Sequence, residues 1–223
     1  MLLQHNTTEF AAIGGSRSLG IETATSDIDL IIVASQPDYE LRMKGGYNTL
    51  YKSPVDFYEM LSLSSRNYIH IFQFLYPEKF MTDNEFTDWI IKNRDGLFAE
   101  NKAVLYDDAC SFLKNVQQNL DAYYKVATKR LSNALAYGKM VEQYAAGVSM
   151  KDCFKATGDW RDRLFKIRNK QMPYETVKEL VETTLSNVVD VQNDTIEPTN
   201  KPKTTELKEI LDLTYFKDYA DHL

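Results

Sequence analysis

The sequence has few residues that form cross-links or bind soft metals, and it has no long apolar run. Its two cysteines, Cys110 and Cys153, lack a CxxC spacing, and its three histidines are scattered, so neither a disulfide scaffold nor a zinc site is expected. No stretch of about 18 apolar residues is present, which argues against a transmembrane helix. The first residues lack the charged start and apolar core of a signal peptide. These absences predict a cytoplasmic protein with free thiols and no membrane partner.

Negative charge outnumbers positive charge, since 32 Asp and Glu stand against 26 Lys and Arg and the net charge is −6. Proteins that coat nucleic acid without sequence preference depend on many lysine and arginine contacts to phosphate, so the whole chain is not expected to bind in that way. A local basic patch is still compatible with binding the end of a nucleic acid. The chain has 223 residues, of which 43% are apolar, and this suits one large domain or two small ones.

Short apolar runs indicate strands in the first part of the chain. A run over 10–13 stops at a Gly-Gly pair, and the nearly continuous apolar run over 28–34 is typical of a buried strand. Residues 39–44 and 47–52 flank a second Gly-Gly pair, which indicates a hairpin. After a proline, residues 55–58 resume the strand pattern at an edge or beyond a bend. We therefore predict a small mixed sheet in an α/β (α+β) fold.

The pattern then becomes helical. Thr82 stands three residues before Glu85, which is the spacing of a capping box and predicts a helix to about Lys92, with a stop near Gly96. Apolar residues at three- and four-residue spacings over 107–146 predict a long helical stretch with one break near 119–123.

The last part of the chain is predicted to be helical as well. Helices are expected over 159–170, 174–190 and 206–220, and the last follows a linker-like segment with two prolines at 193–205. The predicted organisation is a sheet-containing domain over 1–105 and an α-helical domain over 106–223.

A Gly-Ser turn near the N-terminus has the features of a phosphate site. Gly15 and Ser16 follow the first predicted strand and precede a helix start, where free backbone N–H groups, a hydroxyl and the helix dipole favour a bound anion. Arg17 is a further candidate for binding a triphosphate, although a surface ion pair explains it equally well.

Two acids stand at the head of the predicted strand over 28–34. Asp27 and Asp29 are two residues apart and follow Ser26, so the alternation of side chains along a strand places both carboxylates on one face. Neighbouring carboxylates repel each other, and Mg²⁺ (or Mn²⁺) offsets that repulsion while it binds nucleotide phosphate oxygens. Two such ions about 3.5–4 Å apart can clamp the attacking and leaving oxygens of a phosphoryl transfer.

A third carboxylate would complete a site of this kind. Asp56 is the best candidate, because it lies between apolar neighbours on the next predicted strand, where an acid is unusual. In that place it would bind the metal nearest the nucleophile and accept its proton. Glu22, Asp38 and Glu59 are alternatives, since they are also near in sequence.

Gly15-Ser16, followed after residues 17–25 by Ser26-Asp27-Ile28-Asp29-Leu30, resembles the signature of the DNA polymerase beta-like nucleotidyltransferase superfamily. The chain most resembles the nucleotidyltransferases associated with RNA ligases and RNA repair (the RlaP type), over about residues 13–60. The resemblance implies that Gly15 and Ser16, with Ser26 beside the acids, bind the nucleoside triphosphate and that Asp27 and Asp29 bind both metals. Where these proteins often carry an aromatic, this sequence has Ser18-Leu19, so the contacts to base or acceptor are not implied.

The expected activity is a metal-dependent transfer of a nucleoside monophosphate from ATP or another NTP to an acceptor hydroxyl, with release of pyrophosphate. The acceptor is open: an RNA or tRNA, a protein and a small molecule all fit. Two alternatives share the fold, namely a regulatory module that binds NTP without turnover and a toxin or effector with the same chemistry.

A basic stretch in the C-terminal half has two interpretations. Either it faces the cleft and holds an acceptor or a phosphate, or it is a solvated helix face. Its five basic residues are Arg161, Arg163, Lys166, Arg168 and Lys170.

Overall fold

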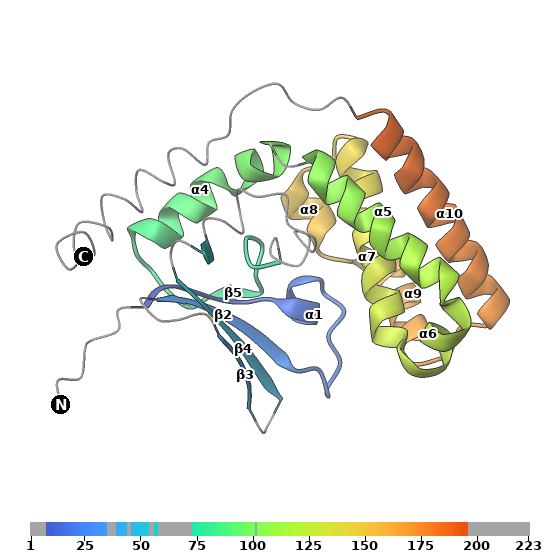
Figure 1. Ribbon diagram of the computed structural model, residues 1–223, viewed down its shortest axis with the longest axis horizontal. Helices are drawn as coiled ribbons and strands as arrows, with labels where there is room; N and C mark the ends of the chain where they lie inside the picture. Colours follow the sequence, from blue (N-terminus) through green and yellow to red (C-terminus); the bar gives the residue numbers. More distant parts are fainter. Residues whose placement is uncertain are drawn as a thin grey trace. The chain divides into compact units, whose positions relative to one another are not determined.

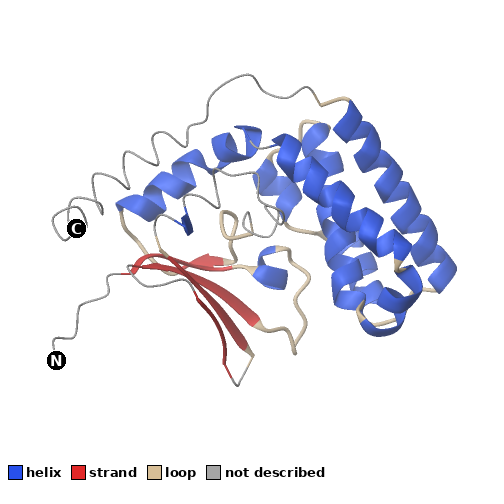
Figure 2. Ribbon diagram, in the orientation of Figure 1, coloured by secondary structure: helices blue, strands red, loops and turns tan. Residues whose placement is uncertain are grey.

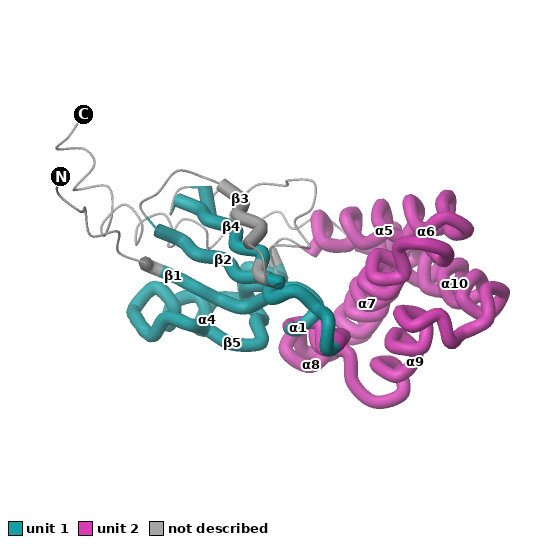
Figure 3. The backbone as a smooth tube through the Cα atoms, turned by 90° about the horizontal axis from the view of Figure 1, so that it is seen from below, with its two compact units in different colours: residues 1–17, 24–100, 199–223 teal, residues 18–23, 101–198 magenta. Residues whose placement is uncertain are grey.

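The computed structural model describes residues 8–34, 39–43, 46–53, 56–57, 73–100 and 102–195 (Figure 1). The described residues form two compact units, coloured separately in Figure 3. One comprises residues 8–17 and 24–100, and we call it the sheet unit. The other comprises residues 18–23 and 102–195, and we call it the helical unit. The predicted helix over 206–220, most of the linker-like segment, and the alternative acids Asp38 and Glu59 lie outside the described residues.

The sheet unit is built on a mixed five-stranded sheet of order β3-β4-β2-β1-β5. β2 pairs antiparallel with β1 and parallel with β4, while β3 and β5 pair antiparallel with β4 and β1. The strands are β1 (Thr8–Ile13), β2 (Ile28–Ala34), β3 (Tyr39–Met43), β4 (Tyr47–Lys52) and β5 (Lys79–Phe80). The predicted buried strand and the predicted hairpin are therefore confirmed.

Aromatic rings fill the core of the sheet unit. Phe10 of β1 stacks on Phe57 with ring centroids 5.4 Å apart and meets Phe86 edge-on at 5.8 Å. Phe86 belongs to α4 (Glu85–Glu100), the helix that packs on β1. All three rings are buried. Their offset and edge-on geometries are the favoured ones for aromatic pairs, so the cluster holds α4 against the sheet.

The start and end of α4 differ from the prediction. Asn84, and not Thr82, caps the helix, because its Oδ1 accepts a hydrogen bond from the Thr87 N–H at 2.9 Å. The Thr82 hydroxyl instead accepts from the Ala11 N–H of β1 at 3.1 Å. The helix also continues through Gly96 to Glu100. A tertiary hydrogen bond to the sheet thus replaced the predicted local cap.

The helical unit contains the helices predicted over 107–146, 159–170 and 174–190, with one more interruption than expected, and one short helix that was not predicted, α8. Its helices are α5 (Lys102–Gln118), α6 (Leu120–Val126), α7 (Thr128–Ala145), α8 (Met150–Phe154), α9 (Gly158–Arg168) and α10 (Tyr174–Asn193). The stretch predicted to break once breaks at Asn119 and again at Ala127. α7 is central and contacts α5, α8, α9 and α10. At Gly138 of α7 an added Cβ would lie 2.5 Å from Thr184 Cγ2, so glycine permits the close approach of α10.

The strands of Figure 2 all precede the long run of helices in the chain, so the predicted fold class, a small mixed sheet followed by an α-helical part, is confirmed. None of the described helices is both long and apolar enough to cross a membrane. Cys110 and Cys153 are free and buried.

Candidate functional site

The Gly-Ser turn follows directly from the end of β1. The Gly14 N–H donates to the Asp29 carbonyl at 2.8 Å, which continues the pairing of β1 with β2 for one more residue. The next residue, Gly15, has φ +67° and donates its N–H to Gln73 Oε1 at 3.0 Å. It also begins α1 (Gly15–Ser18), a single helical turn. The chain therefore leaves the sheet and turns at the glycine.

The Asp29 carboxylate lies directly against this turn. A Cβ added at Gly15 would stand 1.8 Å from Asp29 Oδ2, a distance at which two heavy atoms cannot coexist. Glycine is therefore required at this position for two reasons, its left-handed φ and the approach of a carboxylate. The structure thus brings together Gly15 and Asp29, the two halves of the sequence motif.

The strand register explains where the Asp29 carboxylate is held. Asp29 of β2 stands opposite Asn48 of the parallel strand β4, and Asn48 Nδ2 donates to Asp29 Oδ1 at 3.0 Å. Asp27 directly precedes β2, and the Ile28 N–H between the two acids donates to the Gly46 carbonyl at 2.6 Å. Both carboxylates are partly exposed, and within the described residues neither forms an ion pair. The negative charge of this pair is therefore not neutralised by a neighbouring cation in the described part of the chain.

Ser16 is the other predicted residue of the turn. Its side chain is 2% exposed, and its hydroxyl has no hydrogen-bond partner among the described residues. A buried hydroxyl without a partner costs about 1–3 kcal/mol, so a ligand oxygen at this place would recover the loss. Ser26 is half-buried and already takes part in an interaction.

Arg17 forms a surface ion pair, which is one of the two roles that the sequence suggested for it. Its guanidinium stands 3.7 Å from Glu78 Oε2, and the two side chains are 29% and 42% exposed. The Arg17 Nε is buried and has no partner among the described residues. A surface pair of this exposure is worth about 0–1 kcal/mol, so a triphosphate would compete readily with Glu78 for the guanidinium.

The predicted strand position of Asp56 is wrong. Asp56 and Phe57 are helical, and Ser53 acts as the cap: the Ser53 hydroxyl donates to the Asp56 carboxylate and accepts from the Asp56 N–H at 3.1 Å. β4 ends at Lys52, whose partner in β2 is Val33. Four residues of strand separate Val33 from Asp29, or roughly 13 Å. Asp56 thus follows the end of β4 that is remote from Asp27 and Asp29, and its carboxylate accepts a hydrogen bond from the capping Ser53 hydroxyl.

Apart from Asp56, the predicted metal-binding residues have side chains that suit a hard cation. Within the described residues no group of three or more histidine, cysteine or acidic side chains converges. Asp27, Asp29 and the Ser16 hydroxyl each offer oxygen, which is the ligand type that Mg²⁺ prefers when phosphate oxygens supply further ligands.

Arg161 and Arg168, whose role the sequence left open, donate hydrogen bonds to the segment that joins the Gly-Ser turn to Asp27. Arg161 Nε donates to the Gly20 carbonyl at 2.7 Å, and the Arg168 guanidinium donates to the Ile21 carbonyl at 2.5 Å. Burial lowers the pKa of Arg168, and the nearby Glu22 carboxylate opposes that shift. Both arginines come from α9 and both carbonyls from residues 18–23 of the same unit. Their seven-residue spacing, which puts them on one helix face, was the only sequence signal.

Glu22, one of the alternative third acids, belongs to the same set of contacts. Its Oε1 stands 3.8 Å from the Arg161 guanidinium. The Ala156 N–H adds a hydrogen bond to the Leu19 carbonyl at 2.9 Å. Glu22 therefore has a structural partner in the helical unit.

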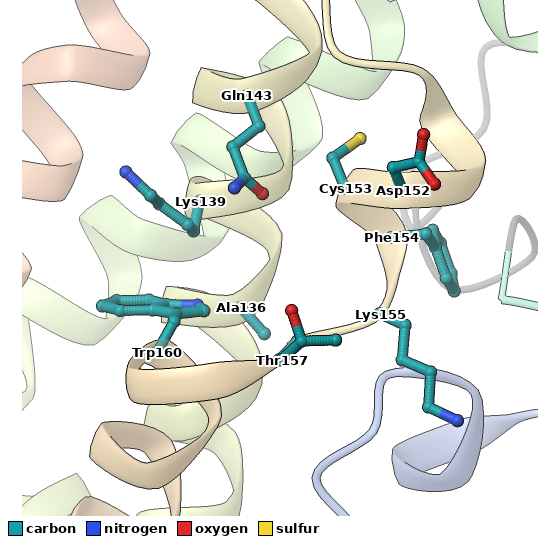
Figure 4. A pocket seen from close by; sticks show the side chains of 10 residues that line it. Ala136, Lys139, Gln143, Asp152, Cys153, Phe154, Lys155, Thr157 and Trp160 are labelled. Carbon is teal, nitrogen blue, oxygen red and sulfur yellow. The ribbon is translucent and has the colours of Figure 1, made fainter.

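A small cavity in the helical unit does not suit a nucleotide (Figure 4). Its volume is about 40 Å³, enough for a water molecule or two. Cys153 at its edge is not a nucleophile, because burial raises the pKa of its thiol to about 12. Its lining is Ala136, Lys139, Gln143, Asp152, Cys153, Phe154, Lys155, Ala156, Thr157 and Trp160.

Comparison with known proteins finds a distant structural similarity. No family model matches the sequence, and no curated protein matches it. Among solved structures, a nucleotidyltransferase-like protein from Exiguobacterium sibiricum 255-15 is similar with a TM-score of 0.32 and 10% identity, over 86% of this chain and 70% of that chain. At this similarity the comparison assigns neither a family nor an activity.

Proposed function

We propose that the chain is a metal-dependent nucleotidyltransferase that moves a nucleoside monophosphate from an NTP to an acceptor hydroxyl. The observation that carries the proposal is the Asp29 carboxylate against Gly15, at the start of the α1 turn. An anion-binding turn and a cation-binding acid in direct contact are what a metal–triphosphate complex requires.

The turn would bind the triphosphate. The Ser16 hydroxyl has no other partner among the described residues, and it would donate to a phosphate oxygen. Arg17 would exchange its exposed Glu78 partner for a phosphate, which is a more highly charged acceptor. Ser26, immediately before the acids, would lie near the same phosphates.

Asp27 and Asp29 would hold Mg²⁺ (or Mn²⁺), and the bound metal would neutralise charge on the phosphates and the leaving pyrophosphate. The acceptor oxygen forms a bond to the α-phosphorus, the bond from that phosphorus to the bridging oxygen breaks, and pyrophosphate leaves with the electron pair. The proton of the acceptor hydroxyl passes to solvent. Rate acceleration would come from positioning and charge stabilisation.

A second candidate function is NTP binding without turnover. Asn48 favours it, because a neutral amide stands in register beside Asp29 and donates a hydrogen bond to one of its oxygens. That hydrogen bond reduces the capacity of Asp29 to bridge two metals. A toxin or effector would share the transferase chemistry and differ only in its acceptor.

Incubation with each of the four NTPs, labelled at the α-phosphate, Mg²⁺ and cell extract tests the proposal. Wild type is expected to release pyrophosphate and to label an acceptor, which mass spectrometry would identify. Asp27→Asn and Asp29→Asn are expected to lose at least 100-fold in rate, on the order of one missing electrostatic contact in the transition state, while their fold is retained. Asp56→Asn is the matched control, since it also removes one acid but lies at a helix cap.

The outcomes separate the candidates. Binding of NTP without pyrophosphate release would select the regulatory module. Full activity in both the Asp27→Asn and Asp29→Asn variants would show that these acids do not form the site.

A further inference from the structure

One end of the helical unit is rich in exposed cations. The C-terminal end of α9 meets the junction of α6 and α7: the Thr128 hydroxyl donates to the Arg168 carbonyl at 2.8 Å, and Lys170 Nζ donates to the Lys125 carbonyl at 2.5 Å. These contacts bring together cationic residues from three helices and the turn after α9. We call them the basic end: Lys125, Lys129, Arg130, Lys166 and Lys170.

No carboxylate of the described residues neutralises the charges of the basic end, although the Lys170 ammonium also donates to the Lys125 carbonyl. All five side chains are exposed, and in the part of the chain that the structure describes none of them forms an ion pair with an acid. The nearest acids in sequence are Asp121, Asp162 and Glu175. The Asp121 carboxylate already accepts a hydrogen bond from the Tyr174 hydroxyl. The basic end is therefore a local excess of positive charge on a chain whose net charge is −6.

Helix stability does not account for two of these cations. Lys129 and Arg130 occupy the first turn of α7, which contains no acid. The positive end of the α7 dipole disfavours cations there, and the negative end of α6, which stops at Val126, offsets that effect, so the helix dipoles do not explain these two side chains.

A third cation occupies an unfavourable backbone position. Lys170 has φ +56° just after α9, where glycine is the usual residue. Its N–H and that of Gln171 close the helix on the carbonyls of Ile167 and Lys166, at 3.0 and 2.7 Å. Glycine would fit this turn without strain, but the lysine side chain adds the hydrogen bond from its Nζ to the Lys125 carbonyl, and within the described residues no acid neutralises its charge.

We propose that the basic end binds the phosphodiester backbone of a nucleic acid strand. Its cations are spread over several elements and do not converge on a pocket, so a row of phosphates matches them better than one small anion does. A lipid surface fits less well, because membrane-bound faces insert several apolar side chains. The strongly exposed large apolar side chain near the basic end is Val126, which is 85% exposed, and a single residue of this kind is less than such faces use.

This inference is independent of the proposed transferase activity, because it concerns residues of the helical unit alone. The Asp29→Asn variant separates the two, since it should lose transfer and retain nucleic acid binding.

Binding is measured by fluorescence anisotropy with labelled 20-nucleotide single-stranded RNA and DNA, across a series of salt concentrations. The wild-type affinity should fall with salt, with a log–log slope of about −0.7 for each phosphate contact. Arg130→Glu should weaken binding by about tenfold or more and make the slope shallower by about one contact. A change in the slope is a readout that a purely structural role of Arg130 would not produce.

The matched control is Lys151→Glu, which makes the same change of charge on the exposed side of α8. α8 follows the opposite end of α7, and the 18 residues of α7 span about 27 Å. This variant should change affinity less than twofold, and circular dichroism should show both variants folded. Equal weakening by both variants, no binding by wild type, or tighter Arg130-dependent binding to phosphatidylserine vesicles than to either oligonucleotide would overturn the proposal.

Discussion

The two units place unpaired charge of opposite sign on different kinds of structure. In the sheet unit, Asp27 and Asp29 sit at the start of a strand, and the Asp29 carboxylate is fixed between Gly15 and Asn48. In the helical unit, the cations of the basic end are long side chains exposed on helix ends. Fixed acids with short side chains suit a metal ion of defined geometry, whereas flexible cations suit a polymer with repeated charges.

The arginines of α9 complete the comparison. Arg161 and Arg168 are also cationic, but their guanidinium groups are bound to the carbonyls of Gly20 and Ile21. Two members of one basic stretch therefore have a structural role, while Lys166 is exposed and Lys170 is exposed with one hydrogen bond to the Lys125 carbonyl. Charge in a sequence does not by itself distinguish these roles, because they depend on which backbone groups lie within reach.

The largest effect is expected at the turn. Gly15→Ala should lower the free energy of unfolding by about 3–5 kcal/mol, because it combines a strained φ with a clash against the Asp29 carboxylate. Gly147→Ala is the control: this glycine also has a positive φ, +87°, but an added Cβ meets nothing within 4 Å, so about 1 kcal/mol is expected. Urea denaturation measures both. Equal losses would mean that the carboxylate does not restrict position 15.

The acid pair is tested by adding a third acid. Asn48→Asp removes the amide that donates to Asp29 and places a carboxylate there, so stability in EDTA should fall by about 2–3 kcal/mol. Mg²⁺ should restore much of this loss, because it offsets the repulsion. Asn48→Ala loses the hydrogen bond without the added charge, and its melting temperature should respond less to Mg²⁺. An identical response in both variants would contradict a cation at this place.

The structural role of the α9 arginines predicts a smaller effect. Arg168→Met should lower stability by about 1–2 kcal/mol, because the Ile21 carbonyl loses its charged donor. Amide exchange over residues 18–23 should also become faster. Arg163→Met, which removes an exposed arginine from the same helix, should change stability by less than about 0.5 kcal/mol. If exchange in this segment were unchanged, the arginine would not be what holds it.

The smallest effect is expected at the buried thiol of Cys153. Burial raises the pKa of the Cys153 thiol from its ordinary value of 9.0 to about 12, so iodoacetamide should alkylate it far more slowly at pH 9 in the folded protein than in urea. Because the folded-state pKa is the higher one, the stabilising contribution is complete below pH 9 and declines as the pH rises towards 12. Rapid alkylation of the folded protein would contradict the burial.

Local patterns predicted most of the described fold. The strand over β2 and the β3–β4 hairpin follow from apolar runs and a Gly-Gly pair, and the helices from apolar spacing. The structure also brings the Gly15 turn against the Asp29 carboxylate, so the two halves of the motif meet. Errors occurred where a side chain had two partners to choose from. Thr82 bonded to β1 in preference to capping α4, and Ser53 caps a helical turn at Asp56 in place of the predicted strand.

What the sequence by itself determined is therefore most of the elements, with the Gly-Ser turn and the acid pair, because these depend on periodicity and on residues close in the chain. Tertiary structure alone decided the partner of each charge. It placed Asn48 beside Asp29, turned Arg161 and Arg168 towards backbone carbonyls, and gathered the basic end from three helices. Those outcomes depend on distances between residues far apart in sequence, which are set only when the strands align and the helices pack.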